Sequence, residues 1–270
     1  MVKEMAHNNN PKTNRLKSTD IDKIDYERMI DIYREKFSDA SNFVFTFVGN
    51  VDSIEFSKLI EQYLATLPAK NVKSVPDEKQ ITPFQKGQIT KHFKQKLEKP
   101  RSNIALIYTG TMPYNLKNMV ITQSLNTILE MNFYSRLIEY ATKINNPNVY
   151  VDLYDFPKGR TSIQIYIETS PEIASTVTDI VKAELIKIAE VGPSVEQIAK
   201  NQDEIFKKRK EILQNNDYWL YILSTYYAYK FDAHTDYDKV LKSISKEDIK
   251  SFTQELLGQG NLIEVIMNPE

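Results

Sequence analysis

The stretch that most constrains this chain is residues 43–68, where an apolar run passes directly into an amphipathic helix pattern. Phe43–Val48 consists of β-branched and aromatic residues with Thr46 as its single polar member, which predicts a strand covered on both faces. A Gly-Asn pair then marks a turn. Apolar residues recur at helical spacing up to Pro68, so a helix with one buried face should follow.

The start of this helix is also encoded. Asp52 stands at the N-cap position and Glu55 follows three residues later, as in a capping box. Val51 and Phe56 occupy the positions of a hydrophobic staple. The sequence therefore predicts a strand–turn–helix unit, which by itself indicates no function.

The rest of the chain pairs strand patterns with long helix patterns. Strands are predicted at 88–97, 103–109, 149–153, 162–168 and 262–267. Helices are predicted from Thr19 or Asp20 onward and at 116–143, 171–191, 194–214, 218–231 and 246–257. Paired strands with few βαβ units favour an α+β fold, in which a two-layer, antiparallel-rich sheet packs on helices.

Four segments are predicted along the chain. Residues 1–17 form a polar flexible arm, 18–70 the tail end of a first half-domain, 71–87 a polar linker, and 88–270 a second half-domain. Residues 24–48 also resemble residues 244–267, each being a helix, an Asn and an apolar strand. This echo predicts two related halves, the first lacking its opening strands, so that Phe43–Val48 is left short of partners.

Composition excludes several function classes. The formal net charge is −1, without the basic surplus of a nucleic-acid-binding protein. The chain has no cysteine, which excludes disulfides and cysteine-ligated metal sites. No apolar run approaches the ~20 residues of a membrane span, and residues 1–17 do not form a signal-peptide pattern.

No catalytic apparatus is visible in the residues. A zinc hydrolase needs two histidines about one helical turn apart, whereas His7, His92 and His234 are far apart in sequence. Solvated histidines are the simplest interpretation of all three. A Gly-x-Ser-x-Gly elbow and a phosphate-binding glycine loop are both absent from the sequence.

Two clusters have a structural and a functional interpretation. The aromatic residues of 218–229 predict a buried helical seam, with a recognition patch as the alternative. Lys207–Lys210 predicts a solvated helix face, with a surface for acidic peptide as the alternative.

Three segments carry a resemblance to a known family. Phe43–Pro68 resembles the strand–Gly-Asn-Val-Asp–helix segment of the pitrilysin/insulinase-type zinc metallopeptidases. Residues 154–159 followed by 164–167, and residues 192–198 followed by 207–220, are similar to later segments of its large bacterial members. The chain is thus similar to the later, zinc-free part of the C-terminal module.

The resemblance implies a fold and a role. Each family module is a tandem of half-domains, and the zinc motif H-x-x-E-H lies in the N-terminal module. The C-terminal module holds no zinc and forms one wall of a peptide-binding chamber. No zinc ligand can be assigned here, so zinc is expected only in the N-terminal module of the parent protein, which would be the metalloendopeptidase. This chain alone should be inactive. Its expected partners are that zinc-bearing module and unfolded peptide substrate, with no nucleic acid and no membrane span.

The family's C-terminal module often uses an Arg and a Tyr, seven residues apart, to hydrogen-bond substrate near the scissile carbonyl. Alignment on Ile128-Leu129 and Pro157-Lys158-Gly159 puts Ile138 at the Arg position and Asn145 at the Tyr position. The isoleucine side chain cannot donate a hydrogen bond, so this pair is degenerate. Arg136 and Tyr150 are close enough to substitute if the register is shifted.

An alternative is a non-catalytic scaffold or assembly subunit of the same fold that binds partner proteins. The absence of cysteine and the many exported bacterial members of the family favour a periplasmic or otherwise exported site over a cytoplasmic one. A small-molecule binding module has no phosphate loop in its favour.

Overall fold

The structure is a computed structural model that describes residues 2–7, 10–13, 15–70, 84–145, 147–154 and 159–270. The chain divides into two compact units. The first contains Met1–Asn14, Ile81–Arg209 and Thr235–Glu270, and the second contains Arg15–Gln80 and Lys210–His234. In the described ranges, no helix combines the length and apolarity needed to cross a membrane.

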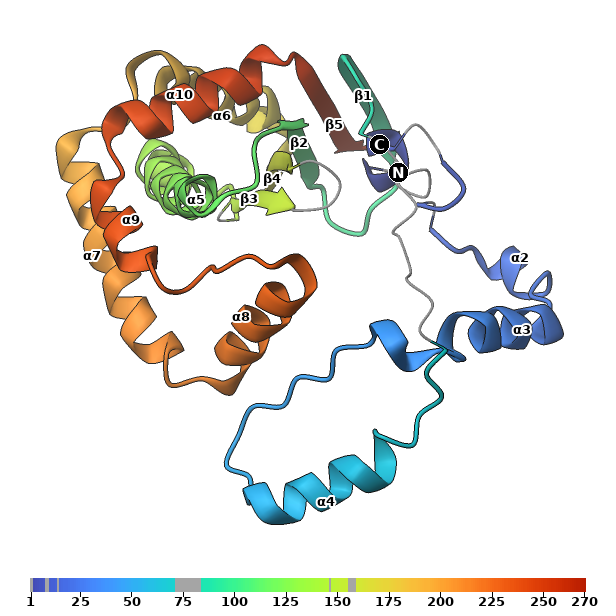
Figure 1. Ribbon diagram of the computed structural model, residues 1–270. Helices are drawn as coiled ribbons and strands as arrows, with labels where there is room; N and C mark the ends of the chain where they lie inside the picture. The colour runs from blue at the N-terminus through green and yellow to red at the C-terminus, as the bar shows by residue number, and fades with distance from the viewer. Residues whose placement is uncertain (1, 8–9, 14, 71–83, 146, 155–158) are drawn as a thin grey trace. The chain divides into compact units, whose positions relative to one another are not determined.

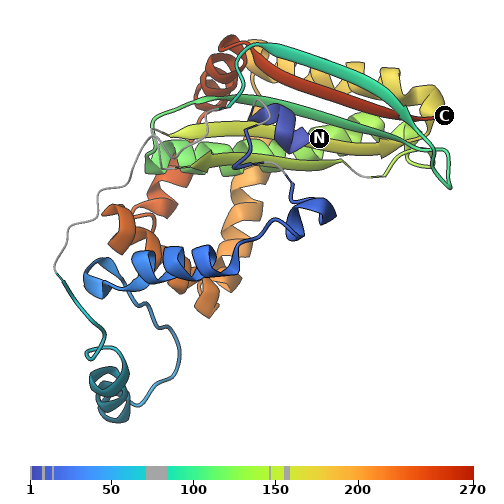
Figure 2. The same ribbon diagram turned by 90° about the vertical axis from the view of Figure 1, so that its right-hand side faces the viewer.

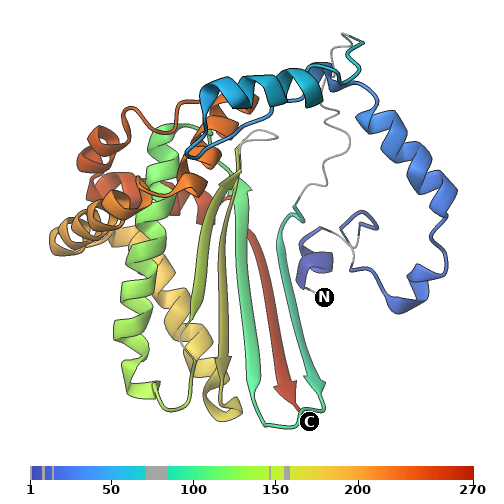
Figure 3. The ribbon, with the colours of Figure 1, turned by 90° about the horizontal axis from the view of Figure 1, so that it is seen from below.

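The first unit is built on a five-stranded sheet with the order β1-β5-β2-β4-β3. Figure 3 shows these strands side by side, with β2 in green, β5 in red and β1 in teal. β5 is parallel to β1, and the other neighbours are antiparallel. The strands are β1 Gln88–Gln95, β2 Ser102–Thr111, β3 Asn148–Tyr154, β4 Arg160–Thr169 and β5 Asn261–Pro269. The predicted α+β fold with an antiparallel-rich sheet is confirmed.

Helices cover one face of this sheet. α5, α6 and α10 lie together on that side (Figure 1). The core is formed by fully buried side chains of these helices and of the strands, among them Phe133, Leu129 and Leu185. Ile163, Ile165 and Ile167 of β4 point into it, as their alternation predicts. The helices of the unit are α1 Val2–Ala6, α5 Leu116–Leu137, α6 Ala174–Val191, α7 Val195–Ile212, which runs on into the second unit, α9 Tyr237–Ser243 and α10 Lys246–Gly258.

Local signals set the boundaries of these helices. Asn115 caps α5 by accepting a hydrogen bond from the Asn118 backbone N–H at 2.8 Å. Ser194 and Gln197 form the predicted reciprocal cap of α7, with distances of 2.8 and 3.1 Å. α5 ends earlier than expected, because a short 3-10 helix, η3 (Ile138–Tyr140), follows it. η4 (Pro171–Ile173) similarly precedes α6.

The other face of the sheet carries a smaller apolar cluster. Ala105, Ile107, Ile263 and Val265 pack there with Ala6, which belongs to α1. Figure 2 shows α1, in dark blue, against the strands. The polar side of β1 lies on the helix side of the sheet, where the half-exposed His92 bonds to Glu264.

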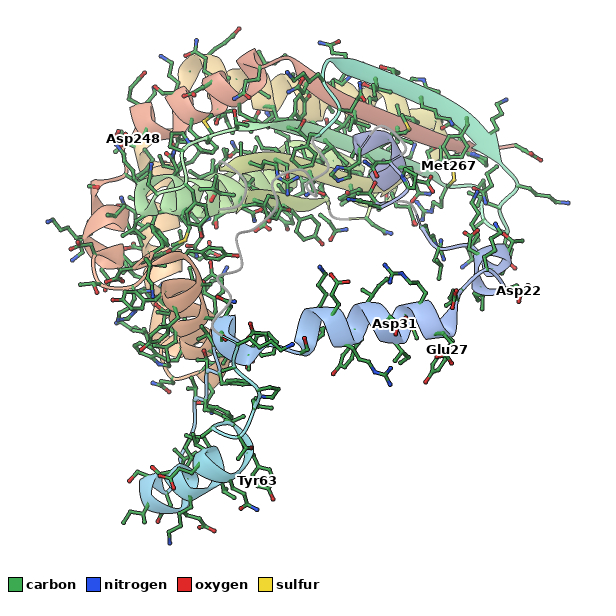
Figure 4. All side chains as sticks on the ribbon, turned by 45° about the vertical axis from the view of Figure 1, so that its right-hand side comes forward. Asp22, Glu27, Asp31, Tyr63, Asp248 and Met267 are labelled. Carbon is green, nitrogen blue, oxygen red and sulfur yellow. The ribbon has the colours of Figure 1, made fainter. Side chains whose placement is uncertain are left out.

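The second unit consists of helices and extended segments. Its helices are α2 Ser18–Ile21, α3 Tyr26–Phe37, η1 Ala40–Asn42, α4 Ser53–Tyr63 and α8 Asn216–Tyr229. Figure 4 labels Glu27 and Asp31 on α3 and Tyr63 on α4. The backbone N–H of Ala40 donates to the Pro68 carbonyl at 2.8 Å, and that of Lys70 donates to Asp39 Oδ1 at 2.9 Å. These bonds hold the two ends of the loop that carries α4 together.

The prediction of a strand at Phe43–Val48 is wrong. The segment has no regular secondary structure and pairs with no strand that the structure describes. Its side chains are exposed instead of covered on both faces, Val44 by 55% and Phe47 by 52%. A strand exists only where a neighbour satisfies its N–H and C=O groups, and the described part of this unit provides no such neighbour. The sequence also predicts that the segment lacks a strand partner on at least one side, and in the described residues it has none on either side.

The helix after this segment forms as predicted but is not buried on one face. Asp52 caps α4, accepting hydrogen bonds from the backbone of Ile54 at 2.9 Å and Glu55 at 3.0 Å. No residue of α4 is buried, and Ile54 is 71% exposed. The helix predicted from Thr19 or Asp20 onward is divided into α2 and α3, and α3 likewise buries no residue. Capping is a local interaction, whereas burial needs a packing partner.

The internal echo is present in the helices and absent in the strands. α3 and α10 occupy equivalent positions in the repeat, but only the second copy continues into a strand, β5. The division into 1–17, 18–70, 71–87 and 88–270 remains a prediction. Most of the predicted linker, residues 71–83, lies outside the described residues, as does part of the turn predicted at 157–159.

Candidate functional site

The face of the sheet opposite α5, α6 and α10, here called the distal face, is the candidate site. It has an apolar half on β1, β5 and β2, formed by Phe93, Met267, Val265, Ile263, Ala105 and Ile107. Its polar half on the β3–β4 hairpin is formed by Asn148, Tyr150, Asp152, Ser162, Gln164 and Tyr166. Met267 is labelled in Figure 4.

Strict alternation along β4 creates this two-faced arrangement. Ile163, Ile165 and Ile167 enter the core, whereas Gln164, Tyr166 and Glu168 point away from it. The antiparallel register places Gln164 between Tyr150 of β3 and Ile107 of β2. Polar and apolar residues therefore meet along one continuous surface.

Hydrogen bonds tie the polar half into one network. The Gln164 side-chain amide donates to Asp152 Oδ2 at 3.1 Å and to Ser162 Oγ at 3.1 Å. The Tyr166 hydroxyl donates to Gln164 Oε1 at 3.0 Å, and the Tyr154 hydroxyl donates to Asp152 Oδ2 at 3.2 Å. Burial, and secondarily the nearby Asp152 carboxylate, raises the pKa of Tyr154. Burial, followed by Tyr150 and Asp152, raises the pKa of Tyr166, so both hydroxyls stay protonated at neutral pH.

Two cavities open on the distal face. One of about 500 Å³ is lined by Ala6, His7, Phe84, Ile107, Tyr154, Arg160, Ser162, Gln164 and Tyr166. The Arg160 guanidinium lies 5.1 Å from the centre of the Phe84 ring and 5.9 Å from that of Tyr154. A second cavity of about 430 Å³ lies along β2, β4 and β5 and includes Phe93, Asn145, Tyr166 and Met267.

The two aligned family positions lie in different surroundings. Ile138 begins η3 and is 56% exposed, with no polar group to offer a substrate. The Asn145 side-chain amide donates to Glu168 Oε1 at 2.9 Å, and Asn145 lines the second cavity. Their role in substrate binding remains a prediction.

The two possible substitutes are also separated. Arg136 Nε donates to Glu184 Oε2 at 3.2 Å, within a group in which the nearly buried Glu184 also accepts from Asn132 at 2.8 Å. Arg136 thus joins α5 to α6 on the helix side of the sheet. Tyr150 lies on the distal face, 51% exposed, with its ring centre 6.3 Å from that of Tyr166.

Each histidine contacts a partner, and none of the three is buried, so the simple expectation of solvated histidines is completed by these contacts. His7 stacks on Phe84 with ring centres 5.3 Å apart, and His234 Nδ1 is 2.7 Å from the Tyr218 hydroxyl. His92 Nε2 is 2.9 Å from Glu264 Oε1. No group of three or more His, Cys, Asp or Glu within the described ranges could hold a metal ion.

Glu264 is the centre of a buried ionic group on the helix side of the sheet. It is 6% exposed and pairs with His92 of β1 and with Lys182 of α6. Burial raises its pKa, but hydrogen bonds from Lys182 and His92 outweigh burial and hold the pKa below its ordinary value. A lowered pKa stabilises the folded state at neutral pH, and this stabilisation is lost as the pH falls below about 4.5.

Glu264→Gln is therefore expected to lower the free energy of unfolding by about 1–3 kcal/mol at pH 7. The difference from the native chain should shrink at pH 3.5, below the ordinary pKa of 4.5, because there the unfolded chain takes up a proton that the folded carboxylate resists. Urea unfolding followed by circular dichroism at both pH values measures it. Glu255→Gln, on the exposed side of α10, is the control and should change little. A loss of equal size at both pH values would contradict the linkage.

The two surface clusters differ from expectation. The aromatic residues of α8 do not form a buried seam, because only Ile222 and Thr225 of this helix are buried, and Tyr221, Tyr226, Tyr227 and Tyr229 are about half exposed. Lys207, Lys208 and Lys210 are solvated as predicted. Arg209 is not: it is 8% exposed, pairs with Asp238 at 2.6 Å and lies 4.1 Å from the centre of the Tyr237 ring.

Asp152, Gln164 and Tyr166 were not singled out from the sequence. The alternation of β4 contained the signal, since its polar positions had to form the face opposite the core. What the pattern could not show was that β3 supplies Tyr150 and Asp152 beside them.

Comparison with known proteins agrees with this fold. The family described as the peptidase M16 inactive domain matches residues 23–205. A zinc protease PQQL-like protein of Arabidopsis thaliana is 24% identical over 244 residues, covering 81% of this chain and 24% of its own length.

Two solved structures are similar along the whole chain. The periplasmic protease PqqL from Escherichia coli has a TM-score of 0.78 and 16% identity, with 100% of this chain and 30% of PqqL covered. The ferredoxin protease FusC, solved in complex with Arabidopsis ferredoxin, has a TM-score of 0.74 and 15% identity, with 99% and 29% covered.

The chain spans less than a third of the length of these relatives. The family match covers more than half of the chain, and it agrees with the family that the three sequence segments resemble. The chain belongs to the peptidase M16 inactive-domain family, the non-catalytic C-terminal part of the pitrilysin-type zinc proteases.

Proposed function

We propose that this chain forms one wall of the peptide-binding chamber of a pitrilysin-type zinc metallopeptidase and contacts unfolded peptide with its distal face. The observation that carries the proposal is the composition of that face. An apolar half from three strands adjoins a network of hydroxyl, amide and carboxylate groups on the hairpin. The opposite face of the same sheet is occupied by the helices of the core.

This surface suits a substrate that is recognised because it is unfolded, and its exact sequence matters less. Burial of apolar side chains contributes about 25 cal/mol per Å² whatever their order. Tyrosine hydroxyls and the Gln164 amide can hydrogen-bond backbone groups, which every unfolded chain exposes. Tyrosines are also common where proteins bind other chains, because the ring is apolar and its hydroxyl is polar. The similar ferredoxin protease was solved with a protein bound, which supports a polypeptide ligand for this chain too.

The zinc for cleavage would come from a partner. We propose that a zinc-bearing N-terminal module of the same protein supplies the metal and the catalytic carboxylate, and that this chain supplies binding surface alone. Arg136 is engaged with Glu184, and Ile138 has no hydrogen-bond donor, so neither suits the hydrogen-bonding role. Tyr150 is the family-position candidate that carries a hydroxyl on the distal face.

Tyr150→Ala is expected to weaken the binding of an unstructured, fluorescein-labelled casein peptide about fivefold to tenfold. The reason is the loss of a half-exposed aromatic ring from the distal face. Fluorescence anisotropy measures the affinity. Tyr229→Ala is the matched control, since Tyr229 is 52% exposed and Tyr150 51%, but Tyr229 lies on α8. If Tyr229→Ala weakens binding and Tyr150→Ala does not, the peptide binds elsewhere.

A second candidate function is that of an assembly scaffold. It is favoured by the exposed apolar side chains of the second unit, which include Met29, Ile32, Phe47, Ile54 and Leu59. Exposed apolar side chains that a partner could bury are typical of protein-binding surfaces. Mixing the chain with a separately produced zinc-bearing module distinguishes the candidates. Restored peptide cleavage supports the chamber wall, whereas tight association without turnover supports the scaffold.

A further inference from the structure

The N-terminal segment Glu4–His7 lies on the distal face of the sheet. Ala6, the last residue of α1, is only 6% exposed and packs with Ala105, Ile107, Ile263 and Val265. Met5 is partly buried against the same cluster. The segment thus covers part of the apolar half of the face proposed to contact peptide.

Residues just before β1 hold this segment in place. The Gln85 backbone N–H donates to the Ala6 carbonyl at 2.8 Å. The rings of His7 and Phe84 stack with 5.3 Å between their centres and 22° between their planes. A backbone hydrogen bond and a stacked ring pair are contacts that a bound peptide could form in the same way.

The segment also forms one wall of the larger cavity. Ala6, His7 and Phe84 line it together with Tyr154, Gln164 and Tyr166 of the polar half. The cavity is therefore bounded by the docked segment as well as by the sheet. A peptide that reached the polar network would meet the segment at the adjoining apolar half.

We propose that Glu4–His7 is an internal competitor for peptide, docked on the distal face in place of substrate. This inference rests on the proposed peptide-binding function of that face. α1 has five residues, too few for a helix that is stable by itself, so its docking depends on the contacts just described. Such a segment can be displaced, and its displacement would expose the part of the apolar half that it covers.

The expected size of the effect follows from the docked population. The apparent affinity for peptide is reduced by the fraction of molecules whose site is free. If the segment is docked in about nine of ten molecules, its release should tighten binding about tenfold.

Ala6→Asp tests the proposal, because a carboxylate at this buried position would oppose docking on an apolar surface. The control is Lys12→Asp, which introduces the same carboxylate at an exposed position of the same N-terminal region. Binding of the labelled casein peptide to the 270-residue chain is measured by anisotropy. The expected result is about tenfold tighter binding for Ala6→Asp and no change for Lys12→Asp.

Other outcomes separate the two proposals. If all three proteins bind the peptide equally, the internal competitor is excluded and the peptide-binding face stands. If none of them binds, both proposals fall. Hydrogen exchange of the unmodified chain gives a second readout: saturating peptide should accelerate exchange of the Glu4–His7 amides. Unchanged or slower exchange of these amides with peptide bound would contradict the proposal that Glu4–His7 competes with peptide.

Discussion

Phe133→Ala should lower the free energy of unfolding by about 3–5 kcal/mol, the largest effect expected from a single truncation in this chain. Phe133 is fully buried in the middle of the helix-side core and belongs to α5. Truncation removes the transfer free energy of the ring and leaves a cavity. The three helices and the sheet that surround it cannot close that cavity without moving together.

Tyr134→Ala is the matched control for this prediction. Tyr134 is the next residue of α5 but is 61% exposed, so its truncation should change stability by less than about 0.5 kcal/mol. The unfolding midpoint in urea, followed by far-ultraviolet circular dichroism, measures both. Equal losses for the two variants would show that α5 does not present Phe133 to the core as described.

Gly159→Ala should lower the free energy of unfolding by about 2–4 kcal/mol, because alanine does not fit the backbone geometry at this position. Gly159 has φ +64°, a backbone conformation that residues other than glycine rarely adopt. A Cβ atom there would lie 1.8 Å from the Met112 carbonyl oxygen. The Gly159 carbonyl also accepts a hydrogen bond from the Met112 N–H at 2.7 Å, next to the Thr111–Arg160 pair that ends the β2–β4 pairing. A shift of the glycine would break this hydrogen bond.

Gly258→Ala is the control for the second prediction. Gly258 ends α10, and a Cβ atom there would meet nothing within 4 Å. Alanine should be neutral or stabilising there by up to about 1 kcal/mol, because it loses less conformational freedom on folding. The same urea midpoints apply. If Gly159→Ala is as harmless as Gly258→Ala, the tight approach between Gly159 and Met112 does not exist in solution.

Features that depend on neighbouring residues could be predicted from the sequence. The Asp52 cap, the Ser194–Gln197 cap and the alternation of β4 are all present as expected. Each depends on residues within a few positions, where hydrogen-bonding groups and periodicity are visible in the sequence.

Features that depend on distant partners could not be predicted. Phe43–Val48 has an excellent strand composition and is no strand, because pairing requires a second chain segment. α9 (Tyr237–Ser243) was missed, since it is short and packs on α5, which is distant in sequence. The contact between His92 and Glu264 was also hidden, because it depends on β5 lying beside β1 in the sheet.

The candidate site shows the same division. The polar positions of β4 were visible as a period of two, but their function depended on Tyr150 and Asp152 from the next strand. The resemblance indicated the role of a zinc-free wall and drew attention to Ile138 and Asn145. The network around Gln164 required the register between strands, which no local pattern specifies.

The position of β5 has a consequence for how the chain is synthesised. This strand pairs with β1 across 172 residues, as the His92–Glu264 contact shows, and lies between β1 and β2 in the sheet. During translation β1 and β2 therefore emerge long before the strand that joins them. Until β5 is made, β1 has no strand partner, and β2 is an unpaired edge of the β2–β4–β3 sheet. A nascent chain stalled before Asn261 should consequently be the form most prone to aggregation and most dependent on chaperones.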